Sequence, residues 1–372
     1  MRYVPIIALI IVGLVPVARA QDKSDRLKAG ISGAAMAVET FVLDYTLHNG
    51  KTAAGKKVPR ESTTYDQQGN ILEHISFRNP TGEPLEKLVY NYDSKGRCVG
   101  YDEYYYSHNP SPSIPRKHVY TLDERGRRTE YRVLEADGSS ASRFVYEYDL
   151  RGNKIAESYY SHTGESIGKL VFVYDGAGNE ISRASLPPNS AGGWKSDKKY
   201  DKAGRPIEWR QYQNGKLRYK ISSAYDEKGR VLSQETVEFN PLQPPNLTPT
   251  HSPIPGKIAY TYDDKKRTEE VTTYVQDGSL TDRVVYTYDE KGNEIGIRRF
   301  NSSGSSVTTA FQFYSELANS QGTFLGSLSG QSLCEFEYDS AGNWTKKTFL
   351  IQGENGDNPQ PYRAELRVIT YR

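Results

Sequence analysis

Seven aromatic side chains are the residues of this sequence best suited to bind a ligand. A tyrosine or tryptophan ring at the surface stacks on the apolar face of a sugar ring, and its polar end hydrogen bonds to hydroxyl groups. These seven lie outside the regular pattern of structural aromatics described below: Tyr104, Tyr105, Tyr106, Tyr159, Tyr160, Trp194 and Trp209. They predict a carbohydrate ligand, whereas most of the other tyrosines are expected to be structural.

No arrangement of residues predicts catalysis or a metal site. His108 and His118 bracket a proline-rich loop, but no two of the 6 histidines have metal-ligand spacing on one strand or helix. Residues 326–330, Gly-Ser-Leu-Ser-Gly, have leucine where a nucleophile elbow needs serine. We therefore predict no catalytic residue, metal or cofactor. The alternative is a hydrolase of surface polysaccharide that uses loop carboxylates such as Glu316 and Asp357.

The two cysteines, Cys98 and Cys334, lie far apart in the sequence. Strands in a flat sheet are about 4.8 Å apart, so such a sheet would keep the two thiols far from each other. The expected state is two free, buried thiols. A disulfide would require the sheet to curl until its distant repeats meet.

An internal repeat predicts the elements that position these residues. Its motif is Tyr-Asp-x-x-Gly followed by Asn or Arg, and glycine is present in nine of ten copies. Lys266 replaces glycine in the eighth copy, and Leu122 replaces tyrosine in the third. Five regular copies are Tyr65-Asp66 with Gly69, Tyr92-Asp93 with Gly96, Tyr148-Asp149 with Gly152, Tyr174-Asp175 with Gly178, and Tyr288-Asp289 with Gly292.

Each copy predicts a tight turn between two antiparallel strands. The aspartate accepts hydrogen bonds from N–H groups ahead of it, and the glycine takes a left-handed conformation. A type I turn with a glycine bulge is a common three-residue hairpin connection. The motif aspartates are therefore expected to form turns and not to bind calcium. At Lys266 we expect a side chain in the left-handed region, at a cost of about 1 kcal/mol.

The flanking sequence alternates as a β-sheet requires. An aromatic residue stands two positions before most motif tyrosines, at Tyr90, Tyr120, Tyr146, Phe172, Tyr260, Tyr286 and Phe336. Successive side chains of a strand point to opposite faces, so each of these aromatics shares a face with its motif tyrosine. The pattern predicts a ladder of aromatics across the strands, with about 0.2–1 kcal/mol for each cross-strand pair.

A second turn, such as Asp137-Gly138 or Asn214-Gly215, lies midway through most repeats. The repeats therefore predict an antiparallel meander of about twenty strands, with motif turns on one edge and second turns on the other. Four insertions, near residues 109–115, 187–193, 241–256 and 315–332, fall on the second-turn edge. Because loops on a rigid scaffold often carry function, we expect any binding site there.

The N-terminus predicts export. Arg2, an apolar stretch from Val4 to Val17, and Ala18-Arg19-Ala20 resemble a signal peptide cleaved after Ala20. No other stretch is long and apolar enough to span a bilayer, so the mature protein is expected to be soluble in the periplasm or outside the cell. Removal of residues 1–20 leaves 46 basic and 46 acidic residues, down from 48 basic. This balance argues against nucleic-acid binding.

The stretch from Tyr288 to Ile295, Tyr-Asp-Glu-Lys-Gly-Asn-Glu-Ile, resembles a unit of the YD-repeat, or Rhs-repeat, proteins. The resemblance covers about residues 60–350. It implies a long β-sheet that spirals into a hollow shell, as in the toxin-complex subunits and teneurins of this family. The chain ends on a repeat strand, so we expect a short secreted member without the self-cleaving core segment of the toxins.

The predicted fold is all-β: one long, twisted antiparallel sheet of tandem hairpins, curled into an open or partly closed shell. The expected organisation is a signal peptide (1–20), leading strands (21–60), the repeat array (61–350) and a C-terminal capping strand (351–372). The expected function is that of a non-enzymatic binding or scaffold module for cell-surface carbohydrate or protein. A purely structural envelope protein is a further alternative.

Overall fold

The computed structural model describes residues 24–48, 51–106, 114–186, 193–239, 256–307, 330–353 and 358–372. They form one short helix and 23 strands in one antiparallel sheet. The helix is α1 (Asp25–Lys28), and the first strands are β1 (Ala35–His48), β2 (Lys51–Tyr65), β3 (Ile71–Phe77), β4 (Pro84–Tyr92), β5 (Cys98–Tyr105), β6 (Arg116–Leu122), β7 (Arg128–Leu134), β8 (Ser140–Tyr148), β9 (Lys154–Tyr160), β10 (Ser166–Tyr174), β11 (Glu180–Leu186) and β12 (Trp194–Tyr200). The others are β13 (Pro206–Gln213), β14 (Lys216–Tyr225), β15 (Val231–Glu238), β16 (Lys257–Asp263), β17 (Thr268–Tyr274), β18 (Leu280–Tyr288), β19 (Glu294–Asn301), β20 (Ser306–Val307), β21 (Gly330–Tyr338), β22 (Trp344–Gly353) and β23 (Gln360–Tyr371).

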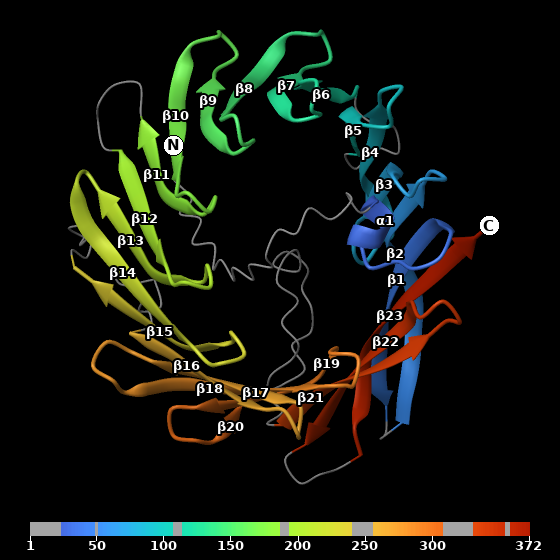
Figure 1. The fold of residues 1–372 in the computed structure, drawn as a ribbon. Coiled ribbons are helices and arrows are strands. Elements are labelled where there is room, and N and C mark those ends of the chain that lie inside the picture. Colours follow the sequence, from blue (N-terminus) through green and yellow to red (C-terminus); the bar gives the residue numbers. More distant parts are fainter. Residues whose placement is uncertain are drawn as a thin grey trace, which may run out of the picture.

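The sheet closes into a ring (Figure 1). Consecutive strands pair with each other, except that β21 pairs with β19 and not with β20. The ring is closed by β23, which pairs with β1 from Ala35↔Tyr371 to Asp44↔Arg363. Strand β20 pairs with β19 alone. The all-β antiparallel fold is confirmed, and the expectation of an open or partly closed shell gives way to a closed ring. The terminal strands, expected to cap two free edges, pair with each other.

The two kinds of turn occupy opposite rims of the ring. We call the rim with the Tyr-Asp turns the motif rim and the other the second-turn rim. In Figure 1 the motif turns joining β10 to β11, β12 to β13 and β14 to β15 point toward the middle of the ring, and the second turn joining β13 to β14 points to its periphery.

The four insertions sit at the shortest strand ladders. The pairs β5–β6, β11–β12, β15–β16 and β19–β21 share at most four residues per strand, whereas every other neighbouring pair in the ring shares at least five. Strands joined by an insertion therefore separate soon after they pair.

The motif turn has the predicted geometry. In the second copy Asp93 Oδ1 accepts hydrogen bonds from the backbone N–H groups of Lys95 and Arg97, both at 2.9 Å, and Gly96 has a φ of +74°. The side chain after the glycine also takes part, because Arg97 Nε donates to Asp93 Oδ2 at 2.7 Å. Where this residue is asparagine, as at Asn153, its amide makes the same bond. Asn and Arg both suit this position because each supplies a donor of suitable reach.

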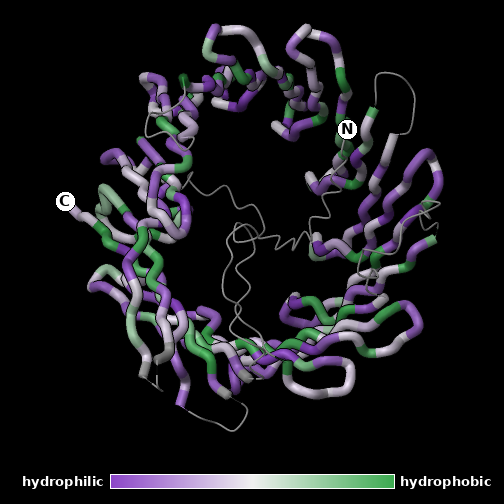
Figure 2. The backbone as a smooth tube through the Cα atoms, turned by 180° about the vertical axis from the view of Figure 1, so that it is seen from behind, coloured by the Kyte–Doolittle hydropathy of each residue, from purple (hydrophilic) through white to green (hydrophobic). Residues whose placement is uncertain are grey.

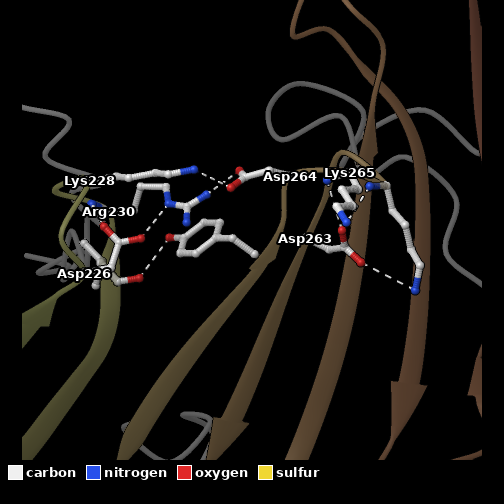
Figure 3. A network of polar contacts seen from close by, with 9 residues as sticks. Asp226, Lys228, Arg230, Asp263, Asp264 and Lys265 are labelled. Atoms are coloured by element: carbon white, nitrogen blue, oxygen red, sulfur yellow. Dashed lines mark hydrogen bonds and ion pairs between the residues drawn. The ribbon is translucent and has the colours of Figure 1, made fainter.

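The eighth copy departs from the prediction. The left-handed residue is Arg267, with a φ of +52°, and not Lys266. Asp263 pairs directly with Thr268, so this hairpin lacks the β-bulge that follows the other motif turns. Its extra acid, Asp264, accepts from Lys228 at 2.5 Å and Arg230 at 2.7 Å of the seventh copy, and so ties the two turns together (Figure 3).

The aromatic ladder is real but differs in membership from the prediction. Residues directly opposite in an antiparallel pair share a face, and Tyr90↔Tyr101, Tyr120↔Tyr131 and Tyr131↔Phe144 are such pairs. We call this side of the wall the aromatic face. Ring contacts at 5.2–6.4 Å between centroids run from Tyr90 through Tyr101, Tyr120, Tyr131 and Phe144 to Tyr159.

Farther along the wall, cations take the place of the neighbouring ring. Phe172, for example, lies between Lys154 and Arg183, whose charged groups are 5.1 and 5.0 Å from its ring centroid. Cation–π contacts thus add to the cohesion of the wall beyond the run of rings from Tyr90 to Tyr159.

The motif tyrosine also bonds to the preceding repeat, which the sequence analysis did not foresee. Six of these hydroxyls donate, at 2.7–2.9 Å, to the carbonyl five residues after the preceding motif aspartate. The bonds are Tyr92–Ile71, Tyr148–Arg128, Tyr174–Lys154, Tyr200–Glu180, Tyr225–Pro206 and Tyr262–Val231. Each carbonyl belongs to a residue beyond the last pair that its strand forms with the following strand, where the two hairpins separate toward the motif rim. We call this bond the tyrosine latch.

The wall is one sheet thick over most of its length. Hydrophobic and hydrophilic residues alternate in short stretches around it (Figure 2). A compact core forms near the chain ends, where Ile31, Ala35, Val38 and Tyr65 are buried together. There the segment around α1 bonds to the first motif turn, through Arg26 N–H to the Gly69 carbonyl, and to the tenth, through Ser32 N–H to Asn343 Oδ1.

Both thiols are free although the ring is closed. Cys98 is half-buried and Cys334 is buried. The expected free state is confirmed, but full burial holds for Cys334 alone, and closure comes from strand pairing between β1 and β23, with no disulfide.

Candidate functional site

Six of the seven candidate aromatics lie at the second-turn rim. Tyr104 and Tyr105 end β5, Tyr106 follows it, Tyr159 and Tyr160 end β9, and Trp194 begins β12. Trp209 lies within β13, opposite Lys198 and Ile221. The structure thus gathers the candidates at one rim but distributes them over three hairpins, so they do not form one site.

The tyrosines at the end of β5 lie on opposite faces of the wall. Tyr105 lies opposite Glu86 on the aromatic face and is 55% exposed, whereas Tyr104 lies opposite Lys87 on the other face. The Tyr106 carbonyl accepts a hydrogen bond from Arg78, which fixes the end of the strand. Tyr105 has the most accessible ring of the three.

The β9 tyrosines are already engaged. Tyr159 contacts Phe144 edge-on at 5.3 Å and belongs to the ladder, contrary to its selection as a residue outside it. Burial raises its pKa, and a hydrogen bond with Glu157 adds to the effect. Tyr160, on the opposite face, has the Arg143 guanidinium 5.1 Å from its ring centroid.

Trp194 lies beside a hollow of about 490 Å³ at the second-turn rim. Its backbone N–H donates to Ser185 Oγ at 2.9 Å, which joins β12 to β11 beyond their last ladder pair. The hollow is also lined by Lys195, Asp197 and Tyr212. Tyr212 was not selected from the sequence. The feature that could have identified Tyr212 is its position directly opposite Lys195, the residue next to Trp194, in the β12–β13 pair.

A larger hollow, of about 650 Å³, opens between β11 and β12 at the motif rim. Its polar groups already bind one another: Glu208 pairs with Lys199 at 2.9 Å and with Arg210 at 3.1 Å, and Tyr200 forms a latch across it. Of these two hollows, the one at the second-turn rim is lined by a candidate aromatic, Trp194, and the larger one is not.

His118 bridges three strands on the aromatic face. It is 8% exposed, and its two ring nitrogens lie 3.0 Å from Glu103 Oε2 and 2.8 Å from the Tyr131 hydroxyl. Its ring stacks on Tyr101 with centroids 4.1 Å apart. The sequence analysis considered His118 only as a partner of His108, which lies outside the described residues. Within the described ranges no three His, Cys, Asp or Glu side chains gather as a metal site.

Two carboxyl groups, Glu269 of β17 and Glu294 of β19, lie on the strands that flank β18. Burial raises the pKa of Glu294, and the nearby Glu269 carboxylate adds to this rise, against the effect of Lys347. Glu269 accepts a hydrogen bond from the Tyr288 hydroxyl at 3.2 Å. The loop carboxylates Glu316 and Asp357, and residues 326–329 of the Gly-Ser-Leu-Ser-Gly stretch, lie outside the described residues.

In the part of the chain that the structure describes, no helix has the length and apolar character to cross a membrane.

No family model matches the chain, and the search of curated proteins finds no match. Among solved structures, TcdB2-TccC3-TEV is 14% identical with a TM-score of 0.24, and the match covers 83% of this chain and 19% of that one. The chain thus spans about a fifth of that protein. A porin-like protein from Bacteroides uniformis ATCC 8492 is 8% identical with a TM-score of 0.27, over 91% of this chain and 99% of that one. These TM-scores are too low to support an inference.

Proposed function

We propose that this chain is a short, exported YD-repeat protein that acts as a non-enzymatic binding scaffold for cell-surface carbohydrate or protein. The ring supplies rigidity, and the second-turn rim supplies the ligand contacts. Residues 1–20 direct export and are removed after Ala20. Mass spectrometry of the protein recovered outside the cytoplasm tests this part, since a mature chain that begins at Gln21 is expected.

One observation carries the binding proposal: the two rims differ in how their polar and aromatic groups are used. At the motif rim the turn aspartates bind their own turns and the tyrosines bind the preceding repeat. At the second-turn rim Tyr105 is exposed and Trp194 lies beside a hollow. Exposed aromatic rings with adjacent polar groups are typical of carbohydrate sites.

A glycan array with the mature protein tests the proposal. Binding is expected for at least one surface glycan, and Tyr105→Ala or Trp194→Ala should reduce the signal at least fivefold. Leu150→Ala is the control, because Leu150 is a 95% exposed apolar side chain in a motif turn. Equal loss in the control, or no glycan bound by the unmodified protein, would contradict the carbohydrate proposal. A pull-down of surface proteins would then test the protein ligand.

A second candidate, a polysaccharide hydrolase, is favoured by Glu294 and Glu269. A carboxyl group with a raised pKa near a second carboxyl group is the pair of groups that glycoside hydrolysis uses. Reducing ends released from surface polysaccharides would be measured for the unmodified protein, Glu294→Gln and Glu269→Gln. Release that both substitutions abolish supports hydrolysis. Release that neither changes excludes this pair.

A further inference from the structure

The hollow beside Trp194 is the feature of the ring that points most clearly to one ligand. Strands β11 and β12 pair only through Ser182–Ala184 with Lys195–Asp197. Beyond these residues, toward the second-turn rim, the ladder stops and the side chain of Ser185 joins the two strands. The opening is therefore held by a side-chain bond and not by continued pairing.

Three side chains lie in a row across this part of the wall. Ala184 is opposite Lys195, and Lys195 is opposite Tyr212, so all three share the face opposite the aromatic face. Alanine is short, lysine is long and tyrosine is broad, and the space above Ala184 is part of the hollow. A volume of about 490 Å³ is within the usual range of small-ligand sites.

The Lys195 cation lies farther from the Tyr212 ring than the cations at two other tyrosine rings do. Lys195 Nζ is 5.9 Å from its centroid, whereas Arg128 lies 3.5 Å from the Tyr120 centroid and Lys291 lies 3.4 Å from that of Tyr338. A cation at the longer distance leaves room for an apolar ring face to pack against the tyrosine.

Hydrogen-bonding groups stand next to this ring. Lys195 Nζ and Asp197 Oδ2 form an ion pair at 3.0 Å with side chains 53% and 32% exposed, and Asp197 Oδ1 accepts from Ser182 at 2.8 Å. An exposed ion pair of this kind contributes only about 0–1 kcal/mol. Its donor and acceptor can therefore exchange partners with ligand hydroxyl groups, and the opposite charges favour a neutral ligand.

We propose that this hollow binds one pyranose ring of a neutral glycan. The apolar face of the sugar packs on Tyr212, Lys195 donates to a ring hydroxyl, and Asp197 accepts from a neighbouring hydroxyl. This inference rests on the proposed carbohydrate function and names a subsite within it.

Isothermal titration with neutral hexasaccharides of glucose, galactose and N-acetylglucosamine tests the proposal. At least one should bind, and Tyr212→Ala should weaken binding at least tenfold, whereas Tyr212→Phe should change it less than threefold. Ala184→Leu fills the hollow without removing a polar group and should also weaken binding at least tenfold. Tyr274→Ala is the matched control, because Tyr274 lies opposite Lys257 of another hairpin as Tyr212 lies opposite Lys195. Circular dichroism establishes that each variant is folded.

The outcomes separate this subsite from the proposed function. If Tyr212→Ala and Ala184→Leu bind like the unmodified protein while Tyr105→Ala or Trp194→Ala loses binding, the rim binds glycan and the subsite is wrong. If no hexasaccharide binds the unmodified protein, the subsite is wrong too, and a positive glycan array would leave the broader function standing.

Discussion

The tyrosine latch predicts a stability effect that no single hairpin would show. In a triple variant, Tyr174→Phe, Tyr200→Phe and Tyr225→Phe, each substitution keeps the ring and removes only the hydroxyl. The three hydroxyls donate at 2.7–2.9 Å to carbonyls of the preceding repeats. The carbonyls belong to Lys154, Glu180 and Pro206, which lie beyond the last pair that their strands form with the following strand, so no backbone donor of that strand replaces the lost bond.

The expected loss follows from the usual value of a hydrogen bond. One intramolecular bond contributes about 0.5–1.5 kcal/mol, and separated sites add nearly independently, which gives about 1.5–4.5 kcal/mol for the variant. This is a large part of the roughly 5–15 kcal/mol by which folded domains are stable. Urea unfolding should shift to lower concentration. Hydrogen exchange should accelerate first in β9–β14, because a repeat array loses stability locally.

The control removes three hydroxyls from tyrosines outside the motif, at Tyr104, Tyr160 and Tyr274. If the triple latch variant and this control unfold at the same urea concentration, the latch does not stabilise the ring. The converse substitution tests the same reasoning. Leu122→Tyr would place a phenol near the Cys98 carbonyl and the Arg97 guanidinium. The new hydrogen bond is expected to raise the free energy of unfolding by about 0.5–1.5 kcal/mol.

Three further results are expected. Burial raises the pKa of Tyr200 and the other latch tyrosines in the folded ring. Their stabilisation is therefore present below about pH 10, the unfolded value, and is lost as the pH rises through the folded pKa. In the triple latch variant the free energy of unfolding should accordingly fall less as the pH rises. Thiol alkylation followed by mass spectrometry should show two free cysteines with or without reductant, and Cys98 should react faster than Cys334, whose pKa burial raises to about 12. His118→Ala removes hydrogen bonds to Glu103 and Tyr131 and should lower the free energy of unfolding by about 1–3 kcal/mol in urea melts, whereas His118→Phe should retain the stack on Tyr101 and lose less.

The local structure was predictable because each motif contains its own turn. Asp93 and Gly96 form a turn within five residues. The alternation of side-chain types before Tyr92 sets the face on which each side chain lies. The aromatic contacts were only partly predictable. Tyr101 and Tyr131 stand outside the motif, and their place in the ladder depends on cross-strand register, which a β-bulge shifts after each regular motif turn.

The position of the candidate aromatics along the wall was predictable, but their surroundings were not. The alternation of turns placed Trp194 and Tyr105 at the second-turn rim. Tyr159 and Tyr160 were chosen as exposed aromatics, yet Phe144 and Arg143 pack against them from a neighbouring strand. Tyr212 was missed because its environment depends on where the β11–β12 ladder ends, and the motif does not encode that point.

Closure was the part of the fold that the motif could not predict, because it depends on residues outside the repeats. A sheet of local hairpins has two free edges whatever its length, and each edge exposes unpaired backbone groups. Here β1 and β23 pair with each other along Ala35–Asp44 and Arg363–Tyr371. The Tyr371 hydroxyl donates to Asp339 of the tenth turn, much as a motif tyrosine bonds to its preceding repeat. The first motif tyrosine, Tyr65, has no preceding repeat and is buried against Ile31 instead. The segment around α1 thus substitutes for a missing hairpin, and the two ends of the chain complete the pattern that the repeats leave open.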